Sequence, residues 1–91
     1  MSETGPWQVI LLREPKKILA RVPADLRRRL LAALHELAVD PRPAGCKKLK
    51  TADPLYRIRV GDWRITYAIE DDNLIVLVTE IAPRGGAYRD L

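Results

Sequence analysis

The chain has 91 residues, of which 47% are hydrophobic, and this length and composition favour a single domain, residues 1–91, with a small core. The net charge of +4, with arginine ahead of lysine, favours nucleic acid or an acidic protein as the partner. The single cysteine, Cys46, excludes an internal disulfide, and the N-terminal residues lack the pattern of a signal peptide. We therefore expect a soluble cytoplasmic protein that makes no contact with a membrane.

Helical periodicity follows one short predicted strand, residues 7–12, in the first half of the chain. Pro15 suits the first turn of a short helix that runs to about Ala20, and Val22-Pro23 breaks and restarts it. A second helix is predicted from Pro23 to about Val39, because apolar residues recur there at helical spacing: Leu26, Leu30, Ala33, Leu34 and Leu37. Two helices joined by so tight a break predict an antiparallel helical hairpin.

The second half of the chain predicts a loop over residues 44–54, followed by three strands at about 55–60, 63–69 and 74–81. Gly61-Asp62 and Asp71-Asp72 supply the turns. The last strand is apolar on both faces, so we place it centrally in the sheet. The predicted fold class is α+β: a small antiparallel sheet of about four strands, in the order βααβββ, with the helical hairpin packed on one face.

The hairpin around Gly61-Asp62 carries the most informative pattern. A two-residue turn pairs Arg59 with Arg64, and side chains alternate between the two faces of a strand. One face then collects the apolar side chains of Tyr56, Ile58, Val60, Trp63, Ile65 and Tyr67. The other face collects Arg57, Arg59 and Arg64. Like charges directly opposite one another destabilise a sheet, so this arrangement indicates a site for an anion, with a solvated basic face as the alternative.

The usual catalytic patterns are absent from the sequence. One histidine, His35, and one cysteine offer neither a nucleophile with its base nor metal-ligand spacing, so we predict no metal and no cofactor. The candidate site is basic instead: Arg57, Arg59, Arg64 and Arg84, with Tyr88 nearby. Arginines around a phosphate stabilise the charge of a transition state, and RNA supplies its own nucleophile, the 2′-OH. The missing component is a general base, because a guanidinium does not lose its proton near neutral pH.

These segments resemble the RelE/ParE toxins of bacterial toxin–antitoxin systems. The resemblance runs from Trp7 to Arg89 and rests on Lys48-Leu49, the hairpin 56–67, the helix end Asp40-Pro41-Arg42-Pro43 and the tail Ile81-Ala82-Pro83-Arg84 with Tyr88-Arg89. It implies a small antiparallel sheet with an N-terminal helical hairpin. For the RelE branch it also implies an endoribonuclease, which cleaves messenger RNA in the ribosomal A site by 2′-OH attack and so inhibits translation.

The resemblance assigns roles to individual positions. The basic pair on the strand falls on Arg57 and Arg59, the transition-state arginine on Arg64, the arginine assigned as the acid on Arg84, and the base-stacking tyrosine on Tyr88. Arginine stands here where the best-known RelE has lysine, so we expect Arg59 to act as an electrostatic stabiliser. The implied partners are a RelB-like antitoxin, messenger RNA in the A site and ribosomal RNA. Candidate contacts for these partners are two basic groups: Lys47, Lys48 and Lys50, and Arg27, Arg28 and Arg29.

Two other functions fit the same sequence. The ParE branch shares the scaffold and inhibits DNA gyrase without the RNA-cleaving residues. The chain could also be a toxin-like module that binds RNA or an acidic protein and cleaves nothing. The arginine set with Tyr88 favours the ribonuclease, and the absence of an evident general base keeps the binding module open.

Overall fold

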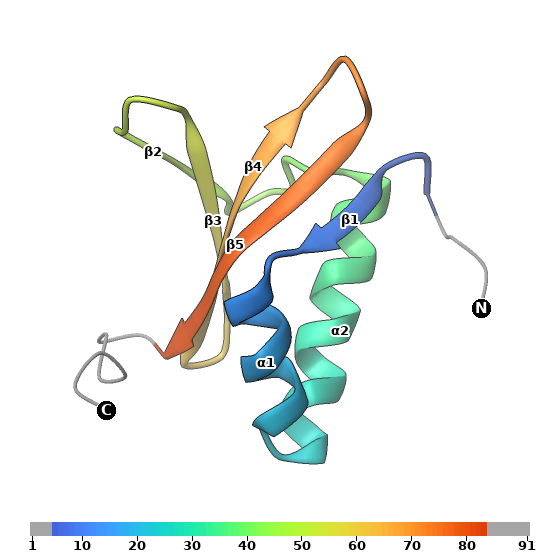
Figure 1. Ribbon diagram of the computed structural model, residues 1–91, viewed down its shortest axis with the longest axis vertical. Helices are drawn as coiled ribbons and strands as arrows, with labels where there is room; N and C mark the ends of the chain where they lie inside the picture. Colours follow the sequence, from blue (N-terminus) through green and yellow to red (C-terminus); the bar gives the residue numbers. More distant parts are fainter. Residues whose placement is uncertain (1–4, 84–91) are drawn as a thin grey trace.

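The computed structural model describes residues 5–83 and has two layers, in which two helices cover one face of a five-stranded sheet (Figure 1). The elements in chain order are β1 (Gln8–Leu11), α1 (Arg13–Arg21), α2 (Ala24–Val39), β2 (Lys47–Leu49), β3 (Leu55–Val60), β4 (Trp63–Glu70) and β5 (Ile75–Pro83). The strands lie in the order β1-β5-β4-β3-β2. The predicted α+β class and the helical hairpin on one sheet face are confirmed.

Two details of the sheet differ from the prediction. The segment 44–54, predicted as a loop, contains β2, which pairs antiparallel with β3 and makes the sheet five-stranded. Three residues are too few for a period-two pattern to appear, so this strand could not be predicted from periodicity. The sheet is also mixed, because β1 pairs parallel with β5 while the other pairs are antiparallel. β5 therefore lies inside the sheet, as its apolar run predicted.

The core lies between α2 and the middle of the sheet. The predicted leucine stripe is buried at Leu30, Leu34 and Leu37, and it packs against β4 and β5. The sheet side of this core consists of Ile65, Tyr67, Val76, Val78 and Ile81. Trp7 and Trp63 are partly buried and pack against the same cluster. This core fixes which face of the β3–β4 hairpin points away from the helices.

Arg27 ties the two helices together at the break between them. Its Nε donates to the carbonyl of Leu19 at 3.0 Å, and its NH2 donates to the carbonyls of Ala20 at 3.0 Å and Val22 at 2.9 Å. The last carbonyls of a helix have no partner within the helix, so this side chain replaces the missing donors. Arg27 therefore has a structural role, which the sequence had not indicated.

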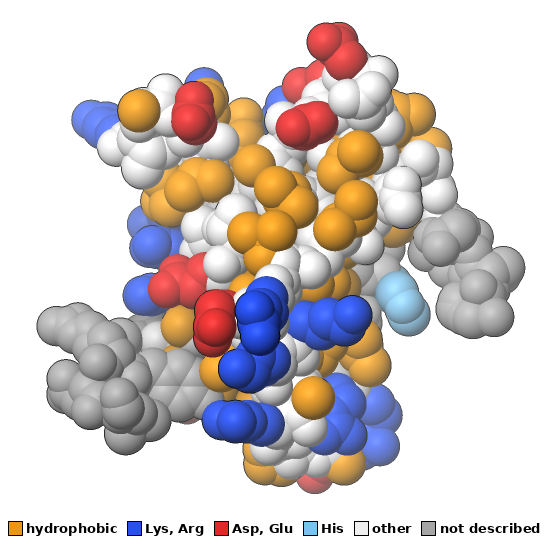
Figure 2. Space-filling view, viewed as in Figure 1, with side chains coloured by type: hydrophobic (Ala, Val, Ile, Leu, Met, Phe, Trp, Pro, Cys, Tyr) orange, Lys and Arg blue, Asp and Glu red, His pale blue; other side chains and the backbone are white. Residues whose placement is uncertain are grey.

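Neither helix in residues 5–83 is both long and apolar enough to cross a membrane. α2 is the longer of the two, with 16 residues, and it carries Arg27, Arg28 and Arg29 in its first half. Basic side chains gather over the helical hairpin, and acidic ones lie at the β4–β5 turn (Figure 2). Positive charge is thus spread over more than one surface, and the location of a functional site must come from geometry.

Candidate functional site

The β3–β4 hairpin has the predicted register. Val60 pairs with Trp63, Arg59 with Arg64, and Ile58 with Ile65. Gly61 takes a φ of 62° in the turn, which is a conformation that glycine adopts without strain. Because the core face of the hairpin packs on α2, the arginines lie on the opposite face of the sheet.

Cross-strand pairing arranges polar side chains in two rows on this outer face. One row runs across four strands and contains Lys47, Arg57, Thr66 and Glu80. The neighbouring row contains Arg59, Arg64 and Ala82. We call the basic part of this surface, formed by Lys47, Arg57, Arg59 and Arg64, the arginine face.

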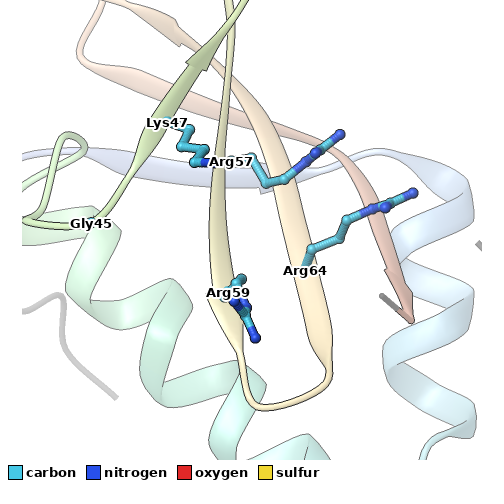
Figure 3. Close-up of a pocket in the computed structure, with 5 residues that line it drawn as sticks. All are labelled: Gly45, Lys47, Arg57, Arg59 and Arg64. Atoms are coloured by element: carbon cyan, nitrogen blue, oxygen red, sulfur yellow. The ribbon is translucent and has the colours of Figure 1, made fainter. Parts of the chain in front are cut away.

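The arginine face lines an open pocket of about 330 Å³, together with Gly45 (Figure 3). Its four basic side chains come from β2, β3 and β4. Arg57 and Arg64 extend in the same direction, whereas Arg59 points toward the hairpin turn (Figure 3). The structure thus brings the three predicted arginines and Lys47 into one pocket. Cationic side chains around a concave surface are suited to bind an anion such as phosphate.

The arginine face also has unsatisfied hydrogen-bond donors. The Nε atoms of Arg57 and Arg64 are buried, and neither has a hydrogen-bond partner among residues 5–83. A buried donor without a partner costs about 1–3 kcal/mol, and the direct opposition of Arg59 and Arg64 adds repulsion. An anion with several acceptor oxygens would relieve both costs. These two unfavourable free-energy terms are expected of a surface that binds an anion, and not of one selected only for stability.

Glu80 lies beside the arginine face and was not predicted. Val76 and Val78 of β5 point into the core, so strict alternation would send Glu80 there too. A register shift opposite Thr66 and Tyr67 adds one residue, Thr79, to β5 and turns Glu80 to the outer face, while Ile81 returns to the core. The Nε of Arg64 lies 3.7 Å from Oε1 of Glu80. One feature of the sequence pointed to this bulge: Glu80 is charged, although strict alternation after Val76 and Val78 would place it in the core.

The three predicted lysines occupy different places. Lys47 lines the pocket. Lys48 pairs with Tyr56, whose ring belongs to the core face, so the backbone directs Lys48 away from the arginine face. Lys50 is exposed beyond the end of β2. Arg84 and Tyr88 lie outside the described residues, and their predicted roles stay predictions.

Tyr67 and Tyr56 make contacts that hold the segment leading to β2. Tyr67 Oη donates to the carbonyl of Pro41 at 2.7 Å, and its ring stacks on Tyr56 with the centroids 6.0 Å apart. Arg42 lies over the Tyr56 ring and forms an ion pair of 3.2 Å with Asp71. Burial raises the pKa of Tyr67 above its usual value. The segment 40–43 is thereby fixed, and with it the approach of Gly45 and Lys47 to the pocket.

The described residues contain no cluster of side chains that could bind a metal ion. Between residues 5 and 83, no three His, Cys, Asp or Glu side chains come together as a possible metal site. Cys46 is a free thiol near Tyr67, and His35 is exposed on α2. The charged groups that the described residues bring to the site are the cationic side chains of the arginine face.

Three comparisons relate the chain to known proteins. Residues 9–88 match the family model described as ParE toxin of the type II toxin–antitoxin system parDE. A Methanocaldococcus jannaschii protein named as a RelE1 toxin is 30% identical over 77 residues, which cover 81% of this chain and 86% of that protein. The toxin RelE of Mycobacterium tuberculosis is 28% identical over 90 residues, covering 98% and 93% of the two chains.

Solved structures agree with the sequence comparisons. A chain of the crystal structure of the archaeal RelE–RelB complex from Pyrococcus horikoshii has a TM-score of 0.78 and 29% identity, covering 88% of this chain and 97% of that one. The family match spans the helices, the sheet and the arginine hairpin. The chain therefore belongs to the RelE/ParE family of toxins from type II toxin–antitoxin systems.

Proposed function

We propose that this toxin is a metal-independent endoribonuclease, which cleaves messenger RNA in the ribosomal A site and thereby stops translation in the cytoplasm. The observation that carries the proposal is the convergence of Arg57, Arg59 and Arg64 with Lys47 on one pocket. Cleavage by the 2′-OH of the substrate needs no nucleophile from the protein. It needs a phosphate held in place and a surface that stabilises the charge of the transition state.

The position of each arginine indicates its role in binding the phosphate or in stabilising the transition state. Arg57 and Arg64 extend in the same direction and have buried Nε donors, so they would hold the non-bridging oxygens of the scissile phosphate. A pentacoordinate transition state carries more negative charge than the bound phosphate, so these contacts strengthen as the reaction proceeds. Arg59, across from Arg64, adds a third positive charge. Arg84 and Tyr88 keep the roles that the resemblance implies, an acid for the leaving group and a stacking partner for a base.

The partner implied by the relatives is a RelB-like antitoxin. The Pyrococcus horikoshii relative was crystallised in a RelE–RelB complex. We propose that an antitoxin of this kind binds the present chain and keeps the arginine face from RNA. Arg28 and Arg29, exposed on α2, are candidate contacts with an acidic antitoxin or with ribosomal RNA, while Arg27 is engaged within the chain.

Inhibition of DNA gyrase is the second candidate function, because the matching family model is described by the parDE system. On the same scaffold, gyrase inhibition would not require the arginine face. A supercoiling assay with purified gyrase therefore separates the two functions. Inhibition of supercoiling that persists in Arg64→Ala would favour DNA gyrase as the target.

The test is induction of the protein in bacteria, with transcript ends mapped by sequencing. Wild type should produce new cuts within translated codons, and Arg64→Ala should not. Arg13→Ala is the matched control, because it removes the same charge from an exposed position at the start of α1. Circular dichroism should show that both variants are folded. Growth arrest without new cuts would reject the ribonuclease, and so would cuts that persist in Arg64→Ala.

A further inference from the structure

We propose that Glu80 is the general base of the site, which accepts the proton of the attacking 2′-OH. This inference rests on the proposed ribonuclease function. The arginine face can hold a phosphate, yet guanidinium groups do not accept protons near neutral pH. A carboxylate next to the arginines supplies that missing capacity.

A local irregularity of the backbone puts Glu80 in this position. Without the extra residue at Thr79, the alternation of Val76 and Val78 would continue and Glu80 would point into the core. The bulge sends it instead to the row that contains Thr66, Arg57 and Lys47. Bulges are frequent beside active sites, where they redirect one side chain. The hydroxyl of Thr79 donates to the carbonyl of Thr66 at 3.2 Å and fixes this irregularity.

The carboxylate is held at one oxygen and open to further contacts. Thr66 Oγ1 donates to Oε1 of Glu80 at 3.3 Å, and Arg64 Nε lies 3.7 Å from the same atom. Within residues 5–83, these are the two polar side-chain partners of Glu80. Its side chain is 46% exposed, whereas Thr66 is buried. A carboxylate accepts about four hydrogen bonds, so a substrate hydroxyl can be added without breaking the existing contacts.

The position relative to Arg64 suits proton transfer. Arg64 pairs with Ala82, so Glu80 is its diagonal neighbour on β5, at a spacing of roughly 7–8 Å between backbones. A phosphate bound by Arg64 would therefore lie close to Glu80. The ribose attached to that phosphate carries the 2′-OH that must lose its proton.

The proposed step is a transesterification. The oxygen of the 2′-OH forms a bond to the adjacent phosphorus, and its proton passes to the Glu80 carboxylate. The bond from phosphorus to the 5′-oxygen of the next nucleotide breaks, and that oxygen takes up a proton whose final source is water. The products are a 2′,3′-cyclic phosphate and a 5′-hydroxyl, and Glu80 returns its proton to water. No bond to the protein forms and no redox change occurs.

Glu80 could instead serve only to orient Arg64, and two substitutions separate these roles. Glu80→Gln keeps a carbonyl oxygen that accepts from Thr66 and lies beside Arg64, but it removes the basic group. Glu80→Ala removes both. A general base predicts that the two variants are equally impaired. A positioning residue predicts that the glutamine variant stays active.

The experiment measures single-turnover cleavage of messenger RNA on programmed ribosomes by the full chain. We expect Glu80→Gln and Glu80→Ala to slow cleavage by about 10²–10⁴-fold, with ribosome binding unchanged. Added formate should partly restore Glu80→Ala, because a small carboxylate can occupy the vacated place, and it should not restore Arg64→Ala. Glu70→Gln is the control, since Glu70 is a carboxylate on the same face at the other end of β4.

The outcomes distinguish this inference from the function on which it rests. Cleavage by wild type together with a fast Glu80→Gln variant overturns the general base. An active glutamine variant beside an inactive alanine variant overturns it in favour of positioning. Wild type that leaves ribosome-bound messenger RNA intact overturns the ribonuclease function itself, and Glu80 then has no such role.

Discussion

Arg59 of β3 and Arg64 of β4 lie directly opposite one another across a two-residue turn. Like charges at directly opposed positions destabilise a sheet, so this pair does not help the hairpin to form. Binding of an anion at this surface would account for the pair. Because a site of this kind trades stability for function, its cost should be measurable.

Neutralising one member of the pair should stabilise the protein. We expect Arg59→Gln to raise the free energy of unfolding by roughly 0.2–1 kcal/mol at low salt, and the gain should shrink as salt screens the repulsion. Urea denaturation at two salt concentrations measures both effects. Arg28→Gln, which breaks an exposed ion pair with Asp25, should show no gain. Loss of stability in Arg59→Gln would mean that this side chain makes contacts that favour folding.

Lys47 and Lys48 offer a matched pair, since they are adjacent in sequence but lie on opposite faces of β2. Lys47→Ala should weaken binding of single-stranded RNA and lower the slope of log affinity against log salt by about 0.7. Lys48→Ala should leave that slope nearly unchanged, because its side chain is directed away from the pocket. Fluorescence anisotropy over a salt series provides the measurement. Equal effects of the two substitutions would contradict a binding site confined to the arginine face.

Removal of the Tyr67 hydroxyl should destabilise the fold. Tyr67→Phe leaves the carbonyl of buried Pro41 without its 2.7 Å hydrogen bond, at a cost of about 1–3 kcal/mol. Chemical denaturation measures this loss. An unchanged free energy of unfolding would show that water replaces the hydroxyl at no cost.

The same hydroxyl should make stability depend on pH at the alkaline end. The folded protein raises the pKa of Tyr67 above its usual 10.0, chiefly by burial, so the neutral form is favoured in the fold. This contribution is fully present below pH 10 and is lost as pH rises toward the raised pKa. The difference in unfolding free energy between wild type and Tyr67→Phe should therefore shrink above pH 10. A difference that is constant across that range would contradict the assignment.

Arg27 and Arg28 separate a structural arginine from a surface one. Arg27→Ala leaves three carbonyls at the helix break without their donor and should cost about 1–3 kcal/mol. Arg28→Ala loses only an exposed ion pair with Asp25 and should cost at most about 0.5 kcal/mol. Thermal and urea denaturation of the two variants give the comparison. Equal stabilities would mean that the helix break is held by packing alone.

The sequence by itself determined the β3–β4 hairpin and the identity of its basic face. A two-residue turn at Gly61-Asp62 sets the register, and period-two alternation then assigns each side chain to a face. Both rules act over neighbouring residues, so the opposition of Arg59 and Arg64 was predictable. The helical hairpin was predictable for the same reason, because its leucine spacing and its break at Val22-Pro23 are local.

Only the tertiary structure decided how distant strands meet. The parallel pairing of β1 with β5, the short strand β2, and the division of Lys47 from Lys48 all depend on partners elsewhere in the chain. The bulge at Thr79 is the most consequential case, since it moves Glu80 from the core side to the side of Arg64. A register shift arises from the fit of one strand against another, and that fit does not exist until the sheet has formed.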